Sequence, residues 1–512
     1  MITTARLRRA VRRETIGVDV RAALNLVGAL FKYLSLAYLF PAAIALGYDE
    51  SPWPFLASAA IVALVGAGLE AVTQGKEHVG AREGFLTVAL IWLFAASAGA
   101  LPYLFSGDAQ LASPVDAYFE GMSGFTTTGA TIVTEIETLS HSMLMWRQFT
   151  QWLGGMGIIV LALAVLPRLR VGGRQLFEQE APGPEIEPLT SSIRDTARRL
   201  WLLYIAITAL CALALSVVAW TGLDGAMSTF DALAHAFSSV PTGGFSTRTR
   251  SFEDFGAASQ WIVAVVMILG GANFALLYMA FVRGRLRMLG RDEELRVYLA
   301  LLCLGSLVLA LELVSEGEFA AGEEAIRHGV FQVVSIMTTS GFASADFALW
   351  SPLALVGLVG LMFIGGSAGS TAGAIKVVRH VVIGKILRRE LDQTVHPEIV
   401  SAVRFNRRPV DERTVRAVIA FVLLYIGLFA VGALLLTIDA AVADVRVTPF
   451  EAIAAAASTL GNVGPAVGFA GPMGSYEQFS DWSKIVMIAL MWLGRLEIIP
   501  VIVLFTRSYW RA

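Results

Sequence analysis

YFEGMSGFTTTGAT (118–131) is the first of four similar segments in this chain, and the others are LAHAFSSVPTGGFST (233–247), FQVVSIMTTSGFAS (331–344) and AAAASTLGNVGPAVG (454–468). Each segment begins with a short apolar run and continues with a stretch rich in glycine and hydroxyl groups. A run of about ten apolar residues is too short to cross a bilayer and can only enter it and return. The four segments therefore predict four re-entrant loops.

The segments align on four glycines, which are Gly129, Gly243, Gly341 and Gly464. In this alignment the first and third segments match without a gap, whereas the second is offset by one residue at Ser238. Each interval carries the same order of elements: a span, a half-span, a glycine-rich stretch and a second span. We therefore predict an N-terminal helix pair in residues 1–80 and four pore repeats, which occupy residues 81–170, 198–290, 296–390 and 412–512.

Irregular backbone at membrane depth is tolerated only where it is buried in protein or lines a watery path. Four loops around a pseudo-fourfold axis would direct their carbonyl oxygens at the axis, where these oxygens can replace the hydration shell of a cation. The C-terminal end of each half-helix also favours a cation through its dipole. The predicted filter residues are Thr127, Thr128, Gly129, Thr242, Gly243, Thr339, Ser340, Gly341, Asn462, Val463 and Gly464.

The composition of the whole chain agrees with a membrane protein. Of 512 residues, 56% are hydrophobic and 16% are charged, whereas soluble proteins have about 25% charged residues. Mean hydropathy is +0.66. So few charges cannot cover the surfaces of several soluble domains, and they exclude a disordered chain. We predict an all-α polytopic membrane protein with ten spans, at 23–47, 54–73, 84–105, 147–167, 199–221, 259–282, 297–315, 353–375, 413–437 and 483–506.

The charges between these spans alternate in sign. Arginine and lysine gather in 6–13, 168–199, 283–291 and 376–416, whereas the intervening segments are mostly acidic. By the positive-inside rule, the N-terminus is predicted to be cytoplasmic. The acidic segments then face outside, either as an ordinary solvated surface or as a surface that concentrates cations.

Two departures from a symmetric pore lie on the predicted inner side of the filter. The stretch GGSAGSTAGAIK (365–376) is too rich in glycine and serine for a stable helix, and it lacks the ending of a phosphate-binding loop. Arg495 lies within a span beside Glu497, where it either makes a structural contact with Glu497 or a carbonyl group, or places a positive charge that slows cations. Lys376 and Arg379 either pair with this segment or anchor the inner interface.

The six histidines show no metal-ligand spacing, so the sequence predicts neither an enzyme nor a protein with a cofactor.

Taken together, the four loops and REGFLTVALIWLFAASAGALPYLF (82–105), QWLGGMGIIV (151–160), GGANF (270–274), GGSAGSTAGAIKVVR (365–379) and GRLEIIP (494–500) resemble the TrkH family of bacterial potassium-uptake proteins, within the TrkH/KtrB/HKT superfamily. The resemblance runs over the chain after residue 20, and the first two spans look like the extra helix pair that KtrB lacks. It implies K⁺ transport across the bacterial inner membrane, with K⁺ as the transported ion. The partners it implies are a second copy of the chain, membrane lipids and a cytosolic TrkA-type nucleotide-binding ring, with no nucleic acid.

The resemblance further implies an intramembrane gate below the filter. Its residues would be Gly365, Gly366, Ser367, Gly369, Ser370, Thr371 and Gly373, together with Lys376, Arg379 and Arg495. A proton- or sodium-coupled potassium symporter is the alternative to a channel-like permease. Inverted repeats would favour the symporter, whereas the four repeats here run parallel and favour a pore.

Overall fold

The structure, a computed structural model, describes residues 18–74, 80–157, 193–398 and 402–511. An N-terminal pair of spans comes first. The first span consists of α2 (Val20–Ala37) and α3 (Leu39–Gly47), and the second is α4 (Trp53–Val72). The backbones of α2 and α4 cross closely, because a Cβ atom added to Gly28 or to Gly66 would lie 2.8 Å from the carbonyl oxygen of the other residue. Small residues at such a crossing are typical of helix packing in membranes.

Four repeats follow, and each consists of a long helix, a short pore helix and a second, shorter helix. They are α5 (Ala81–Phe105), α6 (Pro114–Phe125) and α7 (His141–Gly155); α10 (Ile193–Thr221), α11 (Thr229–Ser239) and α12 (Ala257–Gly270); α15 (Glu293–Ser315), α16 (Glu323–Met337) and α17 (Pro352–Leu361); and α19 (Glu412–Val442), α20 (Pro449–Gly461) and α21 (Asp481–Arg495).

Shorter elements connect or extend these helices. They are η1 (Ala109–Leu111), η2 (Ile136–Thr138), α13 (Phe274–Leu277), η3 (Tyr278–Val282), α14 (Arg287–Arg291), η4 (Phe347–Leu349), α18 (Val377–Val395), β1 (Arg404–Phe405), β2 (Arg408–Pro409), η5 (Gly468–Ala470), α22 (Ile499–Ile502), η6 (Val503–Phe505) and α23 (Arg507–Trp510). The two strands pair as an antiparallel hairpin.

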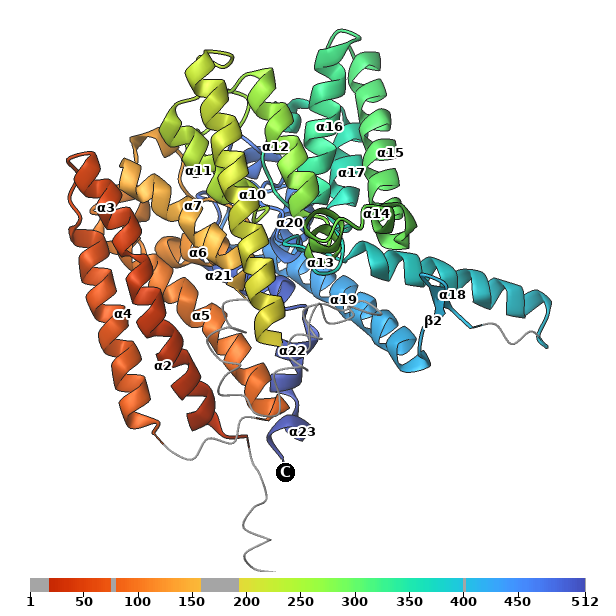
Figure 1. The fold of residues 1–512 in the computed structure, drawn as a ribbon, viewed down its shortest axis with the longest axis horizontal. Coiled ribbons are helices and arrows are strands. Elements are labelled where there is room, and N and C mark those ends of the chain that lie inside the picture. Colours follow the sequence, from red (N-terminus) through yellow and green to blue (C-terminus); the bar gives the residue numbers. More distant parts are fainter. Residues whose placement is uncertain (1–17, 75–79, 158–192, 399–401, 512) are drawn as a thin grey trace, which may run out of the picture.

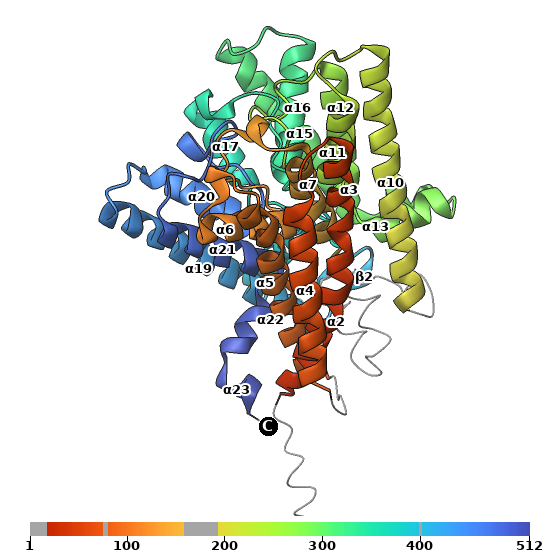
Figure 2. The same ribbon diagram turned by 90° about the vertical axis from the view of Figure 1, so that its left-hand side faces the viewer.

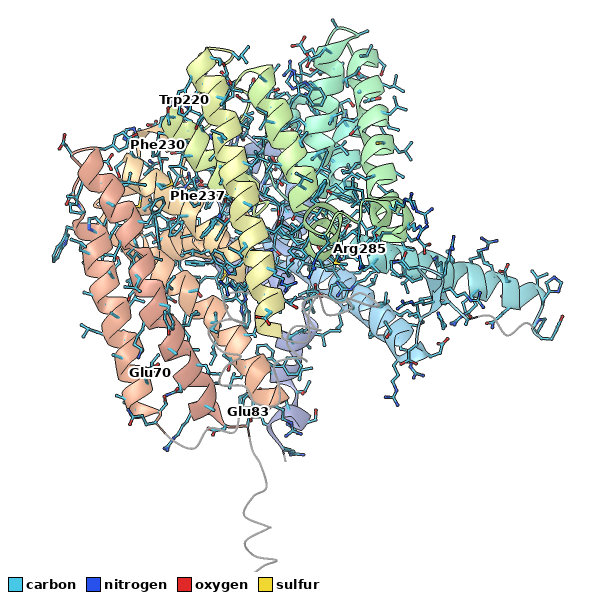
Figure 3. All side chains as sticks on the ribbon, in the orientation of Figure 1. Glu70, Glu83, Trp220, Phe230, Phe237 and Arg285 are labelled. Atoms are coloured by element: carbon cyan, nitrogen blue, oxygen red, sulfur yellow. The ribbon has the colours of Figure 1, made fainter. Side chains whose placement is uncertain are left out.

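The bundle has two distinct ends. Figure 1 shows the turns from α3 to α4, from α10 to α11 and from α15 to α16 at the upper end, and the C-terminus at the lower end. Figure 2 shows the same ends after rotation, with α23 below α22. Side chains follow the same division, since Trp220 lies near the top of α10, whereas Glu70 and Glu83 lie at the bottom of α4 and α5 (Figure 3).

Two of the four pore helices, α11 and α20, begin with capping boxes that the sequence carries. Ser228 caps α11 by accepting a hydrogen bond from the Asp231 N–H, and the Asp231 carboxylate accepts one from the Ser228 N–H. Thr448 and Glu451 form the same reciprocal box on α20. These pairs satisfy N–H groups that have no partner within the helix. The second and fourth pore helices therefore begin at residues that the sequence specifies.

The predicted membrane architecture is confirmed. Among the described residues, six helices are long and apolar enough to cross a membrane, and two bent pairs could each form a further span. The bent pairs correspond to the predicted spans 259–282 and 483–506, in which the chain bends by 103° and 112° between the two helices. Each of these segments is therefore a bent pair of helices, whereas a straight helix was expected.

Two further predicted spans end early. The span at 353–375 is broken, as its glycine-rich stretch predicted, because α17 stops at Leu361 and the chain becomes irregular through that stretch. The helix resumes as α18, which projects sideways from the bundle (Figure 1). In the span at 147–167, α7 ends at Gly155, and residues 158–167 lie outside the described part of the chain. The basic segment 6–13 and residues 168–192 also lie outside it.

Candidate functional site

The four predicted filter loops share one backbone conformation. The residue at the first position is left-handed in every loop, with φ of +54° at Thr127, +55° at Thr242, +57° at Thr339 and +54° at Asn462. Two residues later each loop has a glycine with positive φ, at Gly129, Gly244, Gly341 and Gly464. Four segments far apart in the sequence therefore form the same turn.

This conformation corrects the sequence alignment in the second repeat. Gly244 has φ of +83° and occupies the position that we assigned to Gly243. The N–H of Gly243 donates to the Ser238 carbonyl at 2.9 Å, as the Thr128 N–H donates to the Ser123 carbonyl at 2.9 Å. Ser238 is therefore in register, and the predicted offset of one residue disappears. Two adjacent glycines made the choice ambiguous in sequence, and the backbone conformation decides it.

The loops contact one another in a closed ring. A Cβ atom added to Gly129 would collide with the carbonyl oxygen of Gly243 in the next repeat. The same collision would occur from Gly244 to Ser340, from Gly341 to Val463 and, less severely, from Gly464 back to Thr128. Each glycine is therefore required twice, for its positive φ and for the close approach of the neighbouring backbone.

A buried ion pair lies behind this ring in the first repeat. Arg147 and Glu120 are fully buried, and Nε of Arg147 donates to Oε1 of Glu120 at 2.8 Å. The guanidinium group also donates to the Ser246 carbonyl at 3.2 Å and to Thr131 Oγ1 at 3.1 Å. Because Ser246 and Thr131 follow the filter glycines of two different repeats, this pair joins two adjacent loops.

At the position of Glu120, the side chains of the other three repeats make progressively weaker polar contacts. His235 occupies the Glu120 position in the second pore helix, and its Nε2 lies 2.9 Å from Ser246 Oγ. Gln332 donates from Nε2 to the Phe342 carbonyl at 3.4 Å in the third. The fourth pore helix has Ala455 at this position. The support behind the ring is therefore asymmetric, although the ring itself repeats.

Two filter carbonyls carry additional hydrogen bonds. The Gly464 carbonyl accepts from Ser458 Oγ and from the Tyr476 hydroxyl, both at 2.8 Å. The Gly243 carbonyl accepts from Gln151 Nε2, and the Gln151 side-chain oxygen accepts from the Phe245 N–H at 3.1 Å. These donors hold the loop carbonyls of repeats two and four in fixed directions.

The glycine-rich stretch contacts the first residues of two loops of the ring. Thr371 Oγ1 lies 3.1 Å from Thr242 Oγ1, and the Gly373 N–H donates to Thr339 Oγ1 at 2.7 Å. The same stretch bonds to the second repeat, since the Ser367 N–H donates to the Gly271 carbonyl at 2.8 Å. The base of the stretch is closed where the Gly365 N–H donates to the Ile375 carbonyl at 2.9 Å. We call residues 365–373 the gate loop, after the role that the resemblance implies.

Arg495 contacts the gate loop through carbonyl groups. It donates from Nη1 to the Thr371 carbonyl at 2.8 Å and from Nη2 to the Gly154 carbonyl at 3.2 Å. Of the two structural contacts left open by the sequence, the carbonyl contact is the one found.

Glu497 is instead bonded to Arg379, whose guanidinium group also lies 3.7 Å from the centre of the Phe421 ring. Lys376 Nζ donates to the Ala372 carbonyl, so Lys376 pairs with the gate loop.

A cavity of about 100 Å³ lies beside the gate loop. Its walls include Trp92, Asn273, Thr371, Lys376 and Arg495. Gly154 also lines it, and a Cβ atom on Gly154 would collide with the Phe125 carbonyl at the end of the first pore helix. The second helix of the first repeat thus packs directly against the end of the pore helix.

Comparison with known proteins matches this architecture. Residues 54–511 match the TrkH family, described as cation transport proteins. The chain belongs to the TrkH family. It is 38% identical to the Trk system potassium uptake protein TrkH of Halomonas elongata, over 96% of this chain and all of the relative. It is 37% identical to the protein of that name from Escherichia coli K12, over 96% of this chain and 99% of the relative.

A solved structure extends the match to three dimensions. The crystal structure of the potassium transporter TrkH from Vibrio parahaemolyticus superposes on this TrkH-family chain with a TM-score of 0.84 and 35% sequence identity. The match covers 96% of this chain and all of that one. The fold predicted from the four repeats is therefore that of a TrkH transporter.

The loops that follow the first and second pore helices of this TrkH-family chain are joined to each other. The Thr249 N–H donates to Glu137 Oε1 at 2.8 Å, which joins the first repeat to the second. Burial alone would raise the pKa of the Glu137 carboxyl group, but the hydrogen bonds from Thr249 outweigh burial and hold this pKa below its usual value. Glu137 therefore remains a charged acceptor at neutral pH.

Several residues at this site were not predicted from the sequence. Glu120 and Arg147 each stand in an apolar segment, and an ionisable residue within such a segment is by default a functional hypothesis with a partner to be found. That signal was visible in YFEGMSGF and MLMWRQF. Gln151 gave no comparable signal, because an amide on a helix is common and its partner lies 92 residues away.

Proposed function

We propose that this protein transports potassium across the bacterial inner membrane through the ring formed by the four loops. The observation that carries the proposal is the ring itself, in which four loops adopt one conformation and each glycine abuts the carbonyl of the next repeat. Carbonyl oxygens of this kind can replace the hydration shell of a cation. The relatives of the chain are named as potassium uptake proteins of Trk systems, which supports potassium as the cation.

In this proposal the filter consists of the predicted residues, with Gly244 taking the place of Gly243 as the fourth positive-φ glycine. Potassium is the transported ion, and no resident cofactor is required. The gate loop obstructs the path below the filter, and Arg495 joins it to α7 by donating to the Thr371 carbonyl of the loop and to the Gly154 carbonyl of α7. Lys376 and Arg379 fix the end of the loop and the start of α18.

Ion flux into liposomes that contain the purified protein tests the function. Gradients of K⁺, Na⁺ and pH are varied separately. A pore moves K⁺ along its own gradient in the absence of the other two gradients. Uptake that requires a Na⁺ or pH gradient would instead establish the coupled symporter, and the absence of K⁺ flux under every gradient would contradict the proposal.

Replacement of Gly129 by serine is expected to lower the K⁺/Na⁺ flux ratio by about tenfold, which corresponds to about 1.4 kcal/mol. The added Cβ atom would collide with the Gly243 carbonyl, and φ of +81° disfavours any side chain. The HKT group belongs to the superfamily that this chain resembles, and its sodium-selective members often have serine at the first filter position. The two ion fluxes are measured in liposomes.

The matched control for this variant is Gly47→Ser, because a Cβ atom at Gly47 meets no atom within 4 Å. Gly47→Ser is expected to leave the flux ratio unchanged. An unchanged ratio in a folded Gly129→Ser protein would contradict the filter assignment.

We further propose that the protein is a homodimer with its N-terminus in the cytoplasm, and that a cytosolic TrkA-type nucleotide-binding ring regulates it. The hairpin β1–β2 is the proposed docking surface on the inner side, with exposed arginines at 404, 407 and 408. The alternative is that these charges only face anionic lipid. The relatives are named as parts of a Trk system, which agrees with the presence of further subunits.

Replacement of Arg404, Arg407 and Arg408 by serine is expected to reduce co-purification of the nucleotide-binding subunit by at least about tenfold, because each interfacial charge contributes to association. The matched control replaces Arg283, Arg285 and Arg287, which are also exposed. Arg285, labelled in Figure 3, precedes α14 and is not part of the hairpin. Equal binding by wild type and the hairpin variant, measured by pull-down, would place the docking surface elsewhere.

A further inference from the structure

A buried carboxylate holds both sides of the gate loop. Glu294 lies in the first turn of α15 and is only 5% exposed. Its Oε1 atom accepts a hydrogen bond from the Ala368 N–H at 2.7 Å and another from the Val378 N–H at 3.1 Å. Ala368 belongs to the gate loop and Val378 to the start of α18. One side chain from a different helix thus fixes the distance between the loop and the helix that follows it.

The two residues before Glu294 bind the hairpin. The Glu293 N–H donates to Asn406 Oδ1 at 2.8 Å, and the Asn406 N–H donates back to Glu293 Oε2 at 3.1 Å. Asn406 Nδ2 also donates to Asp292 Oδ2 at 3.0 Å. Asn406 is the turn residue of the hairpin and has φ of +47°. The tip of the hairpin is therefore bonded to the same short segment that carries Glu294.

An apolar cluster makes the same connection. Val403, Phe405 and Val410 of the hairpin region are buried in a cluster with residues from α18, and Ala368 of the gate loop belongs to that cluster. This cluster is separate from the large core of the bundle. The hairpin and the gate loop thus share both a polar and an apolar contact region.

We propose that Glu294 is a positioning residue for the gate loop and that the hairpin acts on the gate through the segment Asp292–Glu294. The inference rests on the proposed function, in which the gate loop obstructs the ion path. A displacement of the hairpin moves Asp292 and Glu293 through Asn406, and Glu294 transmits this displacement to the Ala368 amide. The coupling requires that the segment Asp292–Glu294 have two discrete arrangements. The position of the hairpin and the state of the ion path must each favour one of these arrangements over the other.

Flux in liposomes without any regulatory subunit gives the first test. Glu294→Ala is expected to raise basal K⁺ flux by about tenfold, because the loss of the hydrogen bonds that hold the loop contributes about one decade to an equilibrium. The K⁺/Na⁺ ratio should stay at the wild-type value. Glu294→Gln should remain closer to wild type than Glu294→Ala, because the amide oxygen can still accept both N–H groups.

Asn406→Gly tests the other end of the connection. Glycine tolerates the positive φ of this position but removes the side-chain bonds to Asp292 and Glu293. Basal flux should rise, and the double variant with Glu294→Ala should not exceed Glu294→Ala alone, since both changes act on one connection. Simple addition of the two effects would overturn the relay. If Glu294→Ala does not fold, elevated flux in Asn406→Gly supports the proposal and wild-type flux overturns it.

The matched control is Glu83, which has the same local chemistry at a distant place. It is 5% exposed in the first turn of α5, and its carboxylate accepts N–H bonds from Asp19 at 3.0 Å and from Gly80 at 2.9 Å. Figure 3 shows Glu83 at the bottom of α5. Glu83→Ala should lower thermal stability as Glu294→Ala does, but it should leave flux unchanged. Equal flux changes in both variants would reduce Glu294 to a general structural role.

A second measurement does not depend on ion transport. A cysteine replaces half-buried Ser370 in the gate loop, in a chain where Cys211 and Cys303 are alanine. Its rate of modification by a charged thiol reagent should rise about tenfold with Glu294→Ala, by the same hydrogen-bond argument, and remain constant with Glu83→Ala. An unchanged rate overturns the inference even if potassium transport is established. An increased rate supports the positioning role even if the transported ion proves to be different.

Discussion

Replacement of Arg147 by methionine is expected to cost about 3–5 kcal/mol of folding free energy, because it leaves a buried carboxylate without its partner. Glu120 would keep only the hydrogen bonds from Thr131 and Ile132. Since Arg147 also holds the Ser246 carbonyl of the next repeat, the ring itself would lose a contact between two loops. The amount of folded protein and its melting temperature measure the effect, and potassium uptake should be lost in parallel.

A second substitution separates the uncompensated charge from the loss of packing. The double variant Glu120→Gln with Arg147→Met removes both charges, so it should recover a large part of the stability lost in Arg147→Met alone. Arg250→Met is the control, because Arg250 forms an exposed pair with Glu253. Exposed pairs contribute about 0–1 kcal/mol, so the control should melt near wild type. A double variant no more stable than the single variant would mean that the ion pair does not act as a unit.

The repeats were predictable from sequence because their physics is local. A half-length apolar run ending in a glycine-rich stretch has few solutions in a membrane, and four copies in order imply a ring. The same local rule explains why the break after Leu361 was visible, since glycine and serine destabilise a helix wherever they stand. Positions whose role depends on backbone conformation were less certain, as the choice between Gly243 and Gly244 illustrates.

Contacts between distant segments could not be read from the sequence in the same way. Arg495 was expected to meet either Glu497 or a carbonyl group, and only the fold brings the Thr371 and Gly154 carbonyls to it. The 112° bend after α21 directs Glu497 towards Arg379 instead. Glu294 stands at the end of a span in a run of acidic residues, which is an ordinary pattern for the first turn of a helix. Its bond to the gate loop comes from a residue 74 positions away, and its bond to α18 from a residue 84 positions away.

Deletion of Ala368–Ala372 is expected to raise basal K⁺ flux more than any single substitution, because it removes the segment that crosses below the filter. The deleted residues include Thr371, which bonds to the second repeat and to Arg495. The K⁺/Na⁺ ratio should change little, since the four filter loops keep their contacts with one another. Flux in liposomes is the measurement, and a monodisperse elution profile shows that the shortened chain folds.

Arg495→Ala is expected to raise basal flux by about tenfold, because it removes a positive charge near the path and the bond that holds the gate loop. Substitution by lysine distinguishes the two causes. Lysine keeps the charge, but it cannot hold the Thr371 and Gly154 carbonyls with two nitrogens as the guanidinium fork does. The observed fork predicts that Arg495→Lys resembles Arg495→Ala, whereas a flux near wild type would assign the barrier to charge alone.

The combination of both changes tests whether Arg495 acts through the loop. If its main role is to hold Thr371, Arg495→Ala should add little flux once Ala368–Ala372 are deleted, because the partner is already absent. If charge dominates, the two effects should multiply, since the loop deletion leaves the charge in the vestibule. The fork geometry favours the first result. Folded proteins that carry either change and still show wild-type basal flux would move the barrier away from this region of the pore.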